Sequence, residues 1–327
     1  MTERKIRTAD TSNCVHCHIC QKNCVFLDKY GIDIGDTNRL NELAYHCFLC
    51  GRCSEVCPAG IDGQQVVADM RRNQVKKDAG VFVNKKYKRM ISEKKDYLYR
   101  NYRHITANSV LFPGCNFPSV YPKTMKKLAD LLWETAGIGT VYECCGKPIA
   151  DIGMEEEERK IVRGIEERLL AEDVTEIVAL CPNCYEYLKK NISIKIVNIY
   201  EKLRDLKLGE KISGGGFLFR PCPDREKGEW LPDIECFMKS SCEFVEDIQC
   251  CGLGGNGGVL EPELAKGFAL KIKDMPESIY TYCGSCAGNL TRNGCKKVRH
   301  VLPEILGVHE KPDTVKSLIN RMKTKYL

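Results

Sequence analysis

Apolar residues recur at helical spacing between residues 64 and 77, which predicts an amphipathic helix. The apolar positions are Val66, Val67, Met70 and Val75. Asp62 can cap the start of this helix, and Asp78-Ala79-Gly80 can end it. A shorter helix is predicted over residues 39–45. We therefore expect residues 1–80 to form a small helical domain.

Beyond residue 108 short apolar strands alternate with helices, and this pattern occurs twice. The predicted strands cover residues 109–112, 177–180, 216–219 and 278–282, and the predicted helices cover 124–135, 155–171 and 262–273. The first connection of the second unit lacks a long helical pattern. Alternation of this kind predicts two α/β domains with mainly parallel sheets, over residues 109–213 and 214–327.

Net charge and hydropathy indicate where in the cell this protein is located and which kinds of partner it can bind. The 327 residues carry a net charge of +6. The first residues lack the apolar region of a signal peptide, and no stretch approaches the roughly 18 apolar residues of a spanning helix. We expect a cytoplasmic protein, with any membrane association through a partner.

Residues 81–108 are interpreted as a basic, partly helical connector in which tyrosines alternate with Lys and Arg. A surface for single-stranded nucleic acid would look similar. A connector packed on neighbouring domains is favoured, since no nucleic-acid motif accompanies it, and no nucleic-acid partner is expected.

The twenty-one cysteines carry the chemistry, and eight of them form two identical runs. The runs are Cys14, Cys17, Cys20 and Cys24, then Cys47, Cys50, Cys53 and Cys57. Their spacing is that of ligands to a cubane [4Fe–4S] cluster, whereas structural zinc favours two separated pairs. In such proteins the fourth cysteine of each run binds the other cluster. We therefore expect one cluster on Cys14, Cys17, Cys20 and Cys57, and one on Cys47, Cys50, Cys53 and Cys24. His16, His18 and His46 are interpreted as hydrogen-bond donors.

Ten further cysteines divide equally between the two α/β units. They are Cys115, Cys144, Cys145, Cys181 and Cys184 in the first unit, and Cys222, Cys250, Cys251, Cys283 and Cys286 in the second. Adjacent cysteines cannot form an unstrained disulfide, but they suit a multinuclear cluster. Five cysteines are also one more than a cubane requires.

Three cysteines and one glycine-rich loop remain. Cys236, Cys242 and Cys295 are expected to be buried and inert. Residues 252–257 spell G-x-G-x-x-G, a nucleotide-binding pattern. Because Cys250 and Cys251 immediately precede it, a loop that lines a cluster is favoured over a nucleotide site.

These motifs resemble those of a known family. Quoted in order, they are Phe112-Pro113-Gly114-Cys115, Cys144-Cys145-Gly146, Cys181-Pro182-Asn183-Cys184, Arg220-Pro221-Cys222-Pro223-Asp224, Cys250-Cys251-Gly252-Leu253-Gly254-Gly255 and Cys283-Gly284-Ser285-Cys286. They resemble the cysteine-rich CCG domain pair of heterodisulfide reductase, fused to its ferredoxin-like subunit. The resemblance implies an α+β multidomain fold, with a helical two-cluster ferredoxin-like domain and then two repeated α/β CCG domains. It also implies two cubane and two noncubane [4Fe–4S] clusters, each noncubane cluster on one five-cysteine set.

The function that the resemblance implies is a disulfide-reducing oxidoreductase, suited to an anaerobic organism. Electrons would enter through the cubanes and reduce a small disulfide at the noncubane pair. The same architecture serves flavin-dependent dehydrogenases of 2-hydroxy acids or glycerol-3-phosphate, so an electron-transfer subunit is the alternative. A redox sensor is less favoured, because no DNA-binding helix pair is present. Either main function implies an electron-donor subunit, a flavoprotein or a membrane cytochrome. The sequence identifies no catalytic residue beyond the cysteines.

Overall fold

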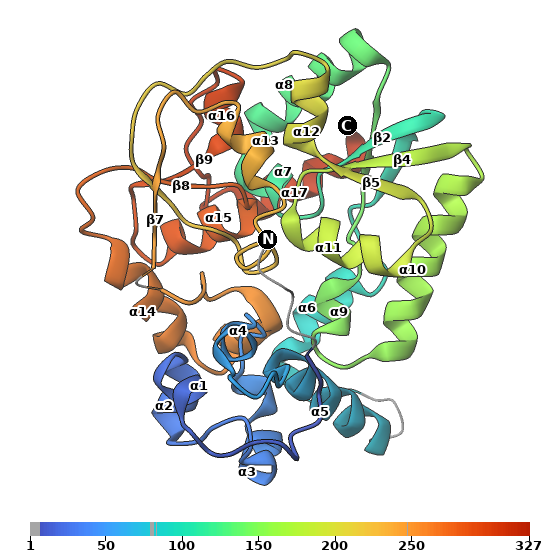
Figure 1. Cartoon of the computed structure of the whole chain (residues 1–327). Coiled ribbons are helices and arrows are strands. Elements are labelled where there is room, and N and C mark those ends of the chain that lie inside the picture. The colour runs from blue at the N-terminus through green and yellow to red at the C-terminus, as the bar shows by residue number, and fades with distance from the viewer. Residues whose placement is uncertain (1–6, 79–81, 83, 247) are drawn as a thin grey trace.

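A computed structural model describes residues 7–78, 82, 84–246 and 248–327. The chain forms a mixed α/β structure with two sheets, and a helical N-terminal region lies below them in the view of Figure 1. Within the described residues, no helix combines the length and the apolar character that crossing a membrane requires.

The first sheet has five strands in the order β1-β3-β2-β4-β5. The strands are β1 (Asn101–His104), β2 (Asn108–Phe112), β3 (Gly139–Tyr142), β4 (Val174–Ala179) and β5 (Lys195–Asn198). Strands β2 to β5 are parallel to one another, whereas β1 pairs with β3 in the antiparallel direction.

The second sheet repeats this arrangement with four parallel strands in the order β7-β6-β8-β9. The strands are β6 (Phe217–Leu218), β7 (Glu243–Phe244), β8 (Ile279–Thr281) and β9 (Val298–His300). Their order corresponds to β3-β2-β4-β5 in the first sheet. The predicted mixed α/β structure with mainly parallel sheets is therefore confirmed.

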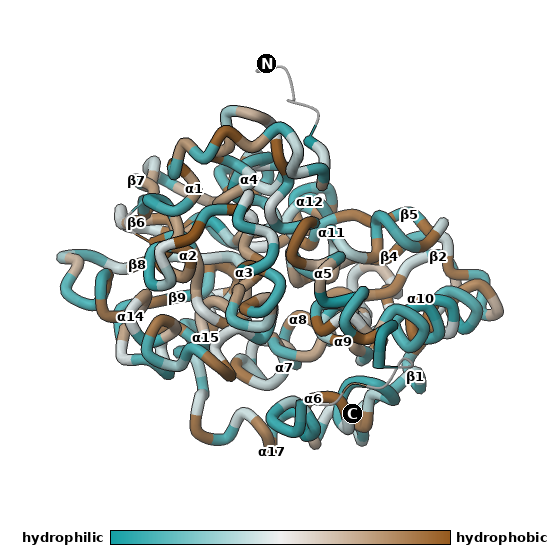
Figure 2. Tube along the Cα trace, turned by 90° about the horizontal axis from the view of Figure 1, so that it is seen from below, coloured by the Kyte–Doolittle hydropathy of each residue, from teal (hydrophilic) through white to brown (hydrophobic). Residues whose placement is uncertain are grey.

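Helices connect the strands of both units. The first unit has α7 (Phe117–Val120), α8 (Pro122–Ala136), α9 (Lys147–Ala150), α10 (Glu155–Leu170), α11 (Pro182–Asn191) and α12 (Ile199–Asp205). The second has α13 (Leu231–Glu235), η3 (Gly254–Val259), α14 (Pro262–Ile272), α15 (Gly284–Arg292) and α16 (Val301–Ile305), followed by α17 (Ser317–Lys323) and η4 (Thr324–Tyr326). Helix α10 is mainly hydrophilic in Figure 2, and its buried apolar residues lie on one face. The bounds of α8, α10 and α14 agree closely with the helices predicted over residues 124–135, 155–171 and 262–273.

The irregular first connection of the second unit is also confirmed. Only the short α13 lies between β6 and β7, where the first unit has the fifteen-residue α8. Trp230, 1% exposed, stacks on Tyr282 and occupies part of this region. The Tyr282 hydroxyl donates to the carboxylate of Asp224 at 2.7 Å, so side-chain packing holds this connection in place of a long helix.

The N-terminal region is helical. It comprises α1 (Ile19–Lys22), α2 (Val25–Tyr30), α3 (Thr37–Glu42), η1 (Ala44–His46), α4 (Arg52–Val56) and α5 (Gly63–Lys77). The Asp62 carboxylate caps α5 by accepting a hydrogen bond from the Gln65 backbone at 3.1 Å, as predicted. The helix predicted over residues 39–45 begins earlier and ends at Glu42. Ala79 and Gly80, the expected stop of α5, lie outside the described residues.

The connector between the N-terminal region and the first unit also contributes a strand to the first sheet. After η2 (Lys85–Tyr87) and α6 (Lys88–Lys94) it forms β1, the antiparallel edge strand that the sequence did not predict. Tyr87 and Tyr97 are 1% and 4% exposed, so their rings are buried and cannot stack on bases. The connector also contacts the C-terminal helix, since Arg321 pairs with Glu93 at 2.6 Å.

One buried arginine joins the N-terminal region to both α/β units. Arg71 is completely buried, and its guanidinium donates to the backbone carbonyls of Ala44, Cys47, Asp151 and Gly255 at 2.5–3.0 Å. The first two carbonyls belong to the N-terminal region, and the others belong to the first and second units. The fork of five N–H donors on one guanidinium can satisfy all of these carbonyls together.

We expect the substitution Arg71→Met to lower the free energy of unfolding by about 3–5 kcal/mol, because four buried carbonyls would lose their donor. The denaturation midpoint of the anaerobically purified chain measures this effect. Arg72→Met is the matched control, since Arg72 is partly exposed and pairs with Asp69 on the same helix. Its loss should cost at most about 1 kcal/mol. Equal losses in the two variants would contradict the role of Arg71.

Candidate metal centres

The cysteines of each α/β unit lie beyond the carboxyl ends of its parallel strands. In the first unit Cys115 follows β2, Cys144 and Cys145 follow β3, and Cys181 follows β4. The second unit places its five cysteines after β6, β7 and β8 in the same way. Because the carboxyl ends of parallel strands meet at one edge of a sheet, five thiols gather at each edge.

The two cysteine sets face one cavity. A cavity of about 870 Å³ is lined by Cys115, Cys145, Cys181 and Cys184 of the first set and by Cys222, Cys251 and Cys286 of the second. The Cys181 thiol hydrogen-bonds to Cys283 across the two units, and this contact lowers the pKa of Cys283 well below its ordinary value. Half-exposed residues such as Glu226 also line the cavity, so it extends from the buried thiols to the surface.

The structure also groups the eight N-terminal cysteines. Cys14, Cys17, Cys20 and Cys57 line one small cavity of their own. Cys24 instead lies beside Cys50, and the Gln249 side-chain amide contacts the Sγ atoms of both. Burial, followed by the charges of Cys47, Cys24 and Cys50, raises the pKa of Cys53 well above its ordinary value, which places Cys53 in the same group. The fourth cysteine of each run therefore lies with the other run.

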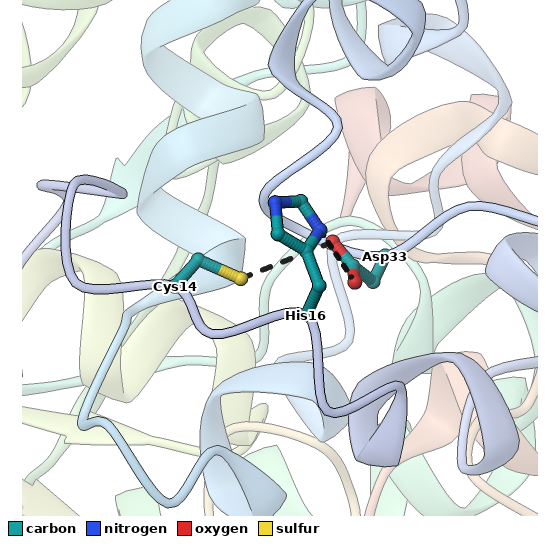
Figure 3. A group of neighbouring side chains, drawn as sticks. All are labelled: Cys14, His16 and Asp33. Carbon is teal, nitrogen blue, oxygen red and sulfur yellow. Dashed lines mark hydrogen bonds and ion pairs between the residues drawn. The ribbon is translucent and has the colours of Figure 1, made fainter.

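A carboxylate lies beside the first of these groups (Figure 3). The buried Asp33 carboxylate is 3.0 Å from Nδ1 of His16, and its Oδ1 is 3.9 Å from Sγ of Cys14. Three ligand atoms from Cys14, His16 and Asp33 lie within 4.8 Å of one another, a spacing that a single metal ion could use. Asp33 Oδ1 already accepts from the Gly35 backbone at 2.7 Å, and Cys14 shares its cavity with three other cysteines. The three other cysteines around Cys14 favour a multinuclear cluster over a single metal ion.

The other two histidines near the cysteine runs, His18 and His46, also face carboxylates. Nδ1 of His18 lies 3.4 Å from Asp33, and Nδ1 of His46 lies 2.6 Å from Glu261. Glu261 is 2% exposed and also contacts Lys29 and Tyr30. These contacts agree with the interpretation of the three histidines as hydrogen-bonding residues.

The N-terminal group around Cys50 touches the second unit directly. A hydrogen bond with the Cys250 thiol is the largest influence on Cys50 and lowers its pKa to about 6. Cys50 also lines the large cavity, whereas Cys17 of the other N-terminal group is exposed. The charge of Cys20 acts on Cys53, so the two N-terminal groups are neighbours. The cysteine groups therefore extend from the exposed Cys17 to the cavity between the two units.

Buried cations accompany the thiols, and the sequence did not identify them. A hydrogen bond with Cys144, and then the charges of Lys94 and Arg321, lower the pKa of Cys115 to about 5 against the effect of burial. Lys94 comes from the connector and Arg321 from α17. In the second unit, burial lowers the pKa of Arg225, but Cys222 and other anions raise it overall.

The candidate ligands at these sites are mainly cysteine sulfurs, in groups of four and five, and positive charge lies beside the two five-cysteine sets. Thiolate is the ligand form of cysteine, and nearby cations stabilise it. Soft thiolate ligands in such groups are typical of iron–sulfur clusters, so the residues fit that cofactor.

The glycine-rich loop 252–257 packs against the N-terminal region. At Gly255, where φ is +60°, a Cβ atom would lie 2.6 Å from the backbone carbon of Phe48. At Gly257 it would lie 2.7 Å from the carbonyl oxygen of Cys47. Residues 253–256 also line the large cavity. The glycines therefore permit close contact between backbones, and the loop is not free to enclose a phosphate.

The three remaining cysteines differ in exposure. Cys295 is completely buried, as expected, and Cys242 is partly buried. Cys236 is exposed, so the expectation of burial is wrong there. It ends the short α13, and its Sγ donates to the Pro232 carbonyl at 3.2 Å. None of these three lines the large cavity.

Comparison with known proteins supports the nature of these sites. Residues 109–189 match the family model described as the CCG cysteine-rich domain. One subunit of the fumarate reductase (CoM/CoB) of Methanothermobacter marburgensis is 23% identical over 332 residues, which cover 85% of this chain and 67% of that protein. One subunit of the dihydromethanophenazine:CoB–CoM heterodisulfide reductase of Methanosarcina acetivorans is 24% identical, over 75% of this chain and 71% of its own. An iron–sulfur protein of Methanococcus maripaludis is 25% identical, and the match covers 75% of this chain and 56% of that protein.

A solved structure, glutamate racemase RacE1 of Bacillus anthracis, aligns with a TM-score of 0.32 at 13% identity, over 62% of this chain and 79% of its own. That likeness is too small to support a conclusion about the fold. The matched residues 109–189 run from β2 into α11 and contain all five cysteines of the first unit. The chain therefore contains a CCG cysteine-rich domain and is a homologue of iron–sulfur proteins that include a heterodisulfide reductase subunit.

Proposed function

We propose that this chain is an iron–sulfur oxidoreductase that reduces a small disulfide, using two cubane and two noncubane [4Fe–4S] clusters. The observation that carries this proposal is the shared cavity, which both five-cysteine sets line and which extends to the surface. A protein that only conducts electrons would not need to open both sets to a small molecule.

The cluster assignments follow the grouping of the thiols. We assign one cubane to Cys14, Cys17, Cys20 and Cys57, and the other to Cys47, Cys50, Cys53 and Cys24, in a helical ferredoxin-like domain over residues 1–80. A noncubane cluster is assigned to each five-cysteine set of the units 109–213 and 214–327. The contact of Cys50 with Cys250 supports passage of electrons from the N-terminal domain to the second unit.

Reduction of a disulfide consumes two electrons and two protons and yields two thiols. Bound clusters would supply the electrons one at a time. The chain holds the two thiol sets at one cavity, where a disulfide can meet both. Lys147 lines this cavity and pairs with Asp151 at 2.6 Å. Its positive charge can stabilise a product thiolate before the thiolate is protonated.

A second candidate function is an electron-transfer subunit of a flavin-dependent dehydrogenase of 2-hydroxy acids or glycerol-3-phosphate. The exposed Cys17 favours an external electron donor in both cases, because electrons could enter at that end of the series. The relatives are named as subunits of reductases, which supports a partner subunit for this chain too. We propose that this partner is a flavoprotein or a membrane cytochrome.

The first test is the iron content. Four tetranuclear clusters require about sixteen irons per chain. We expect that number after full anaerobic reconstitution, measured together with acid-labile sulfide. Cys236→Ser should leave it unchanged, because Cys236 is exposed and does not line the cavity. A content near eight irons would contradict occupancy of both CCG sets.

The second test concerns the crossed ligation of the cubanes. Cys17→Ser and Cys50→Ser first identify which reduced-cluster EPR signal belongs to each run. We then expect Cys24→Ser to remove the Cys50 signal and Cys57→Ser to remove the Cys17 signal. If Cys24→Ser removes the Cys17 signal instead, each run binds its own cluster and the ferredoxin-like assignment fails.

The third test concerns the reaction. We expect Cys145→Ser and Cys251→Ser to abolish disulfide reduction with an artificial electron donor, because each removes a ligand at the shared cavity. Both variants should keep the N-terminal cubane signals, since those ligands belong to another domain. A broad panel of disulfides is required, because neither the sequence nor the cavity specifies one.

The same experiment separates the two candidate functions. Binding of a thiol product should alter the paramagnetic signal of the partly oxidised protein, and labelled thiol sulfur should broaden it. A fully loaded protein that reduces no disulfide, shows no thiol-dependent signal and readily accepts electrons from a copurifying flavoprotein would establish the electron-transfer function instead.

A further inference from the structure

Gln249 links two cysteine groups that belong to different domains. It immediately precedes Cys250 and Cys251 of the second unit. Its side-chain Nε2 donates to Sγ of Cys24 at 3.3 Å and lies 3.6 Å from Sγ of Cys50. One amide from the second unit therefore contacts two thiols of the N-terminal region.

The orientation of this amide is fixed by its other end. Oε1 of Gln249 accepts a hydrogen bond from the Val25 backbone N–H at 2.8 Å. An amide nitrogen could not accept that bond, so Nε2 must point toward the sulfurs. The backbone of Gln249 is held as well, because its carbonyl accepts from Arg225. The same guanidinium donates to the carbonyl of Cys50 at 2.9 Å and pairs with Glu55.

We propose that Gln249 is a positioning residue that raises the reduction potential of the cluster bound by the Cys50 group. This inference rests on the proposed binding of a cluster to that group. Reduction adds negative charge to a cluster and its thiolates, and hydrogen bonds to the sulfurs stabilise that charge. Because Cys24 and Cys50 are buried, water competes little with the amide, and the hydrogen bond has a larger electrostatic effect.

The other N-terminal group has the opposite kind of neighbour. Sγ of Cys14 lies 3.9 Å from the carboxylate of Asp33, a negative charge that opposes reduction and that His16 and His18 offset in part. The two groups therefore differ in a defined direction. The group near the exposed Cys17 should have the lower potential, and the group beside Gln249 the higher one. Electrons that enter at the surface would then move energetically downhill toward Cys250.

Two substitutions separate the effect on the potential from support of the fold. Gln249→Glu keeps the acceptor for the Val25 N–H but replaces the donor beside the sulfurs with a negative oxygen. Gln249→Leu removes both groups. In an EPR-monitored redox titration at pH 8, we expect both variants to move the Cys50 signal to a more negative potential. The expected change in the ratio of reduced to oxidised cluster is about tenfold, which is about 59 mV for one electron.

The matched control is Gln64→Leu. The Gln64 side-chain amide donates to the carbonyl of Leu49 at 2.7 Å, next to Cys50 in the chain, and this bond reaches no sulfur. The control should retain the potential of the Cys50 signal, and the Cys17 signal should stay unchanged in all three variants. Iron content is measured in each preparation, so that loss of a cluster is not mistaken for a shift.

Several results would overturn the proposal. They are an unchanged Cys50 potential at full iron content in both Gln249 variants, an equal shift of both signals, or loss of about four irons in Gln249→Glu. The test does not depend on the crossed ligation, because Cys50→Ser identifies the signal by itself. It does not depend on a disulfide substrate either, so failure of the proposed reaction would be recognised separately.

Discussion

The buried guanidinium of Arg71 brings together the three parts of this protein on which the metal sites depend. Its hydrogen bonds end on carbonyls from the N-terminal region and from both α/β units. A guanidinium remains charged when buried, so its charge must be balanced nearby. The carbonyl dipoles supply part of that balance, and Cys47 supplies another part when it is a thiolate. Burial raises the pKa of Cys47 to about 12, and Arg71 opposes that rise by favouring the thiolate.

The two sheets explain why both five-cysteine sets can line a single cavity. The four parallel strands have the same order in each sheet, and each sheet places its cysteines at the carboxyl ends of these strands. Two similar edges can then face each other, as the contact between Cys181 and Cys283 shows. The exception is the short connection around α13, where Trp230 packs on Tyr282. The two units therefore share their strand order and the positions of their cysteines, but the helices that connect their first two strands differ in length.

Electrostatic compensation comes from segments outside the cysteine motifs. Lys94 lies in the connector and Arg321 in the C-terminal helix, yet both act on Cys115 of the first unit. Arg225 does the same beside Cys222, and it also contacts the Cys50 carbonyl. Many thiols can be buried together only if positive charge or hydrogen-bond donors lie close to them.

The sequence by itself determined the features that depend on local pattern. Cysteine spacing indicated the thiol groups, the recurrence of strands and motifs indicated two parallel units, and Asp62 indicated the start of α5. Tertiary structure alone decided that β1 joins the first sheet, that Cys236 is exposed, and that Gln249 reaches Cys24. Gln249 and Cys24 are separated by 225 residues, so no local periodicity connects them. Contacts of that kind arise from how the domains pack, because packing brings side chains together irrespective of their distance along the chain.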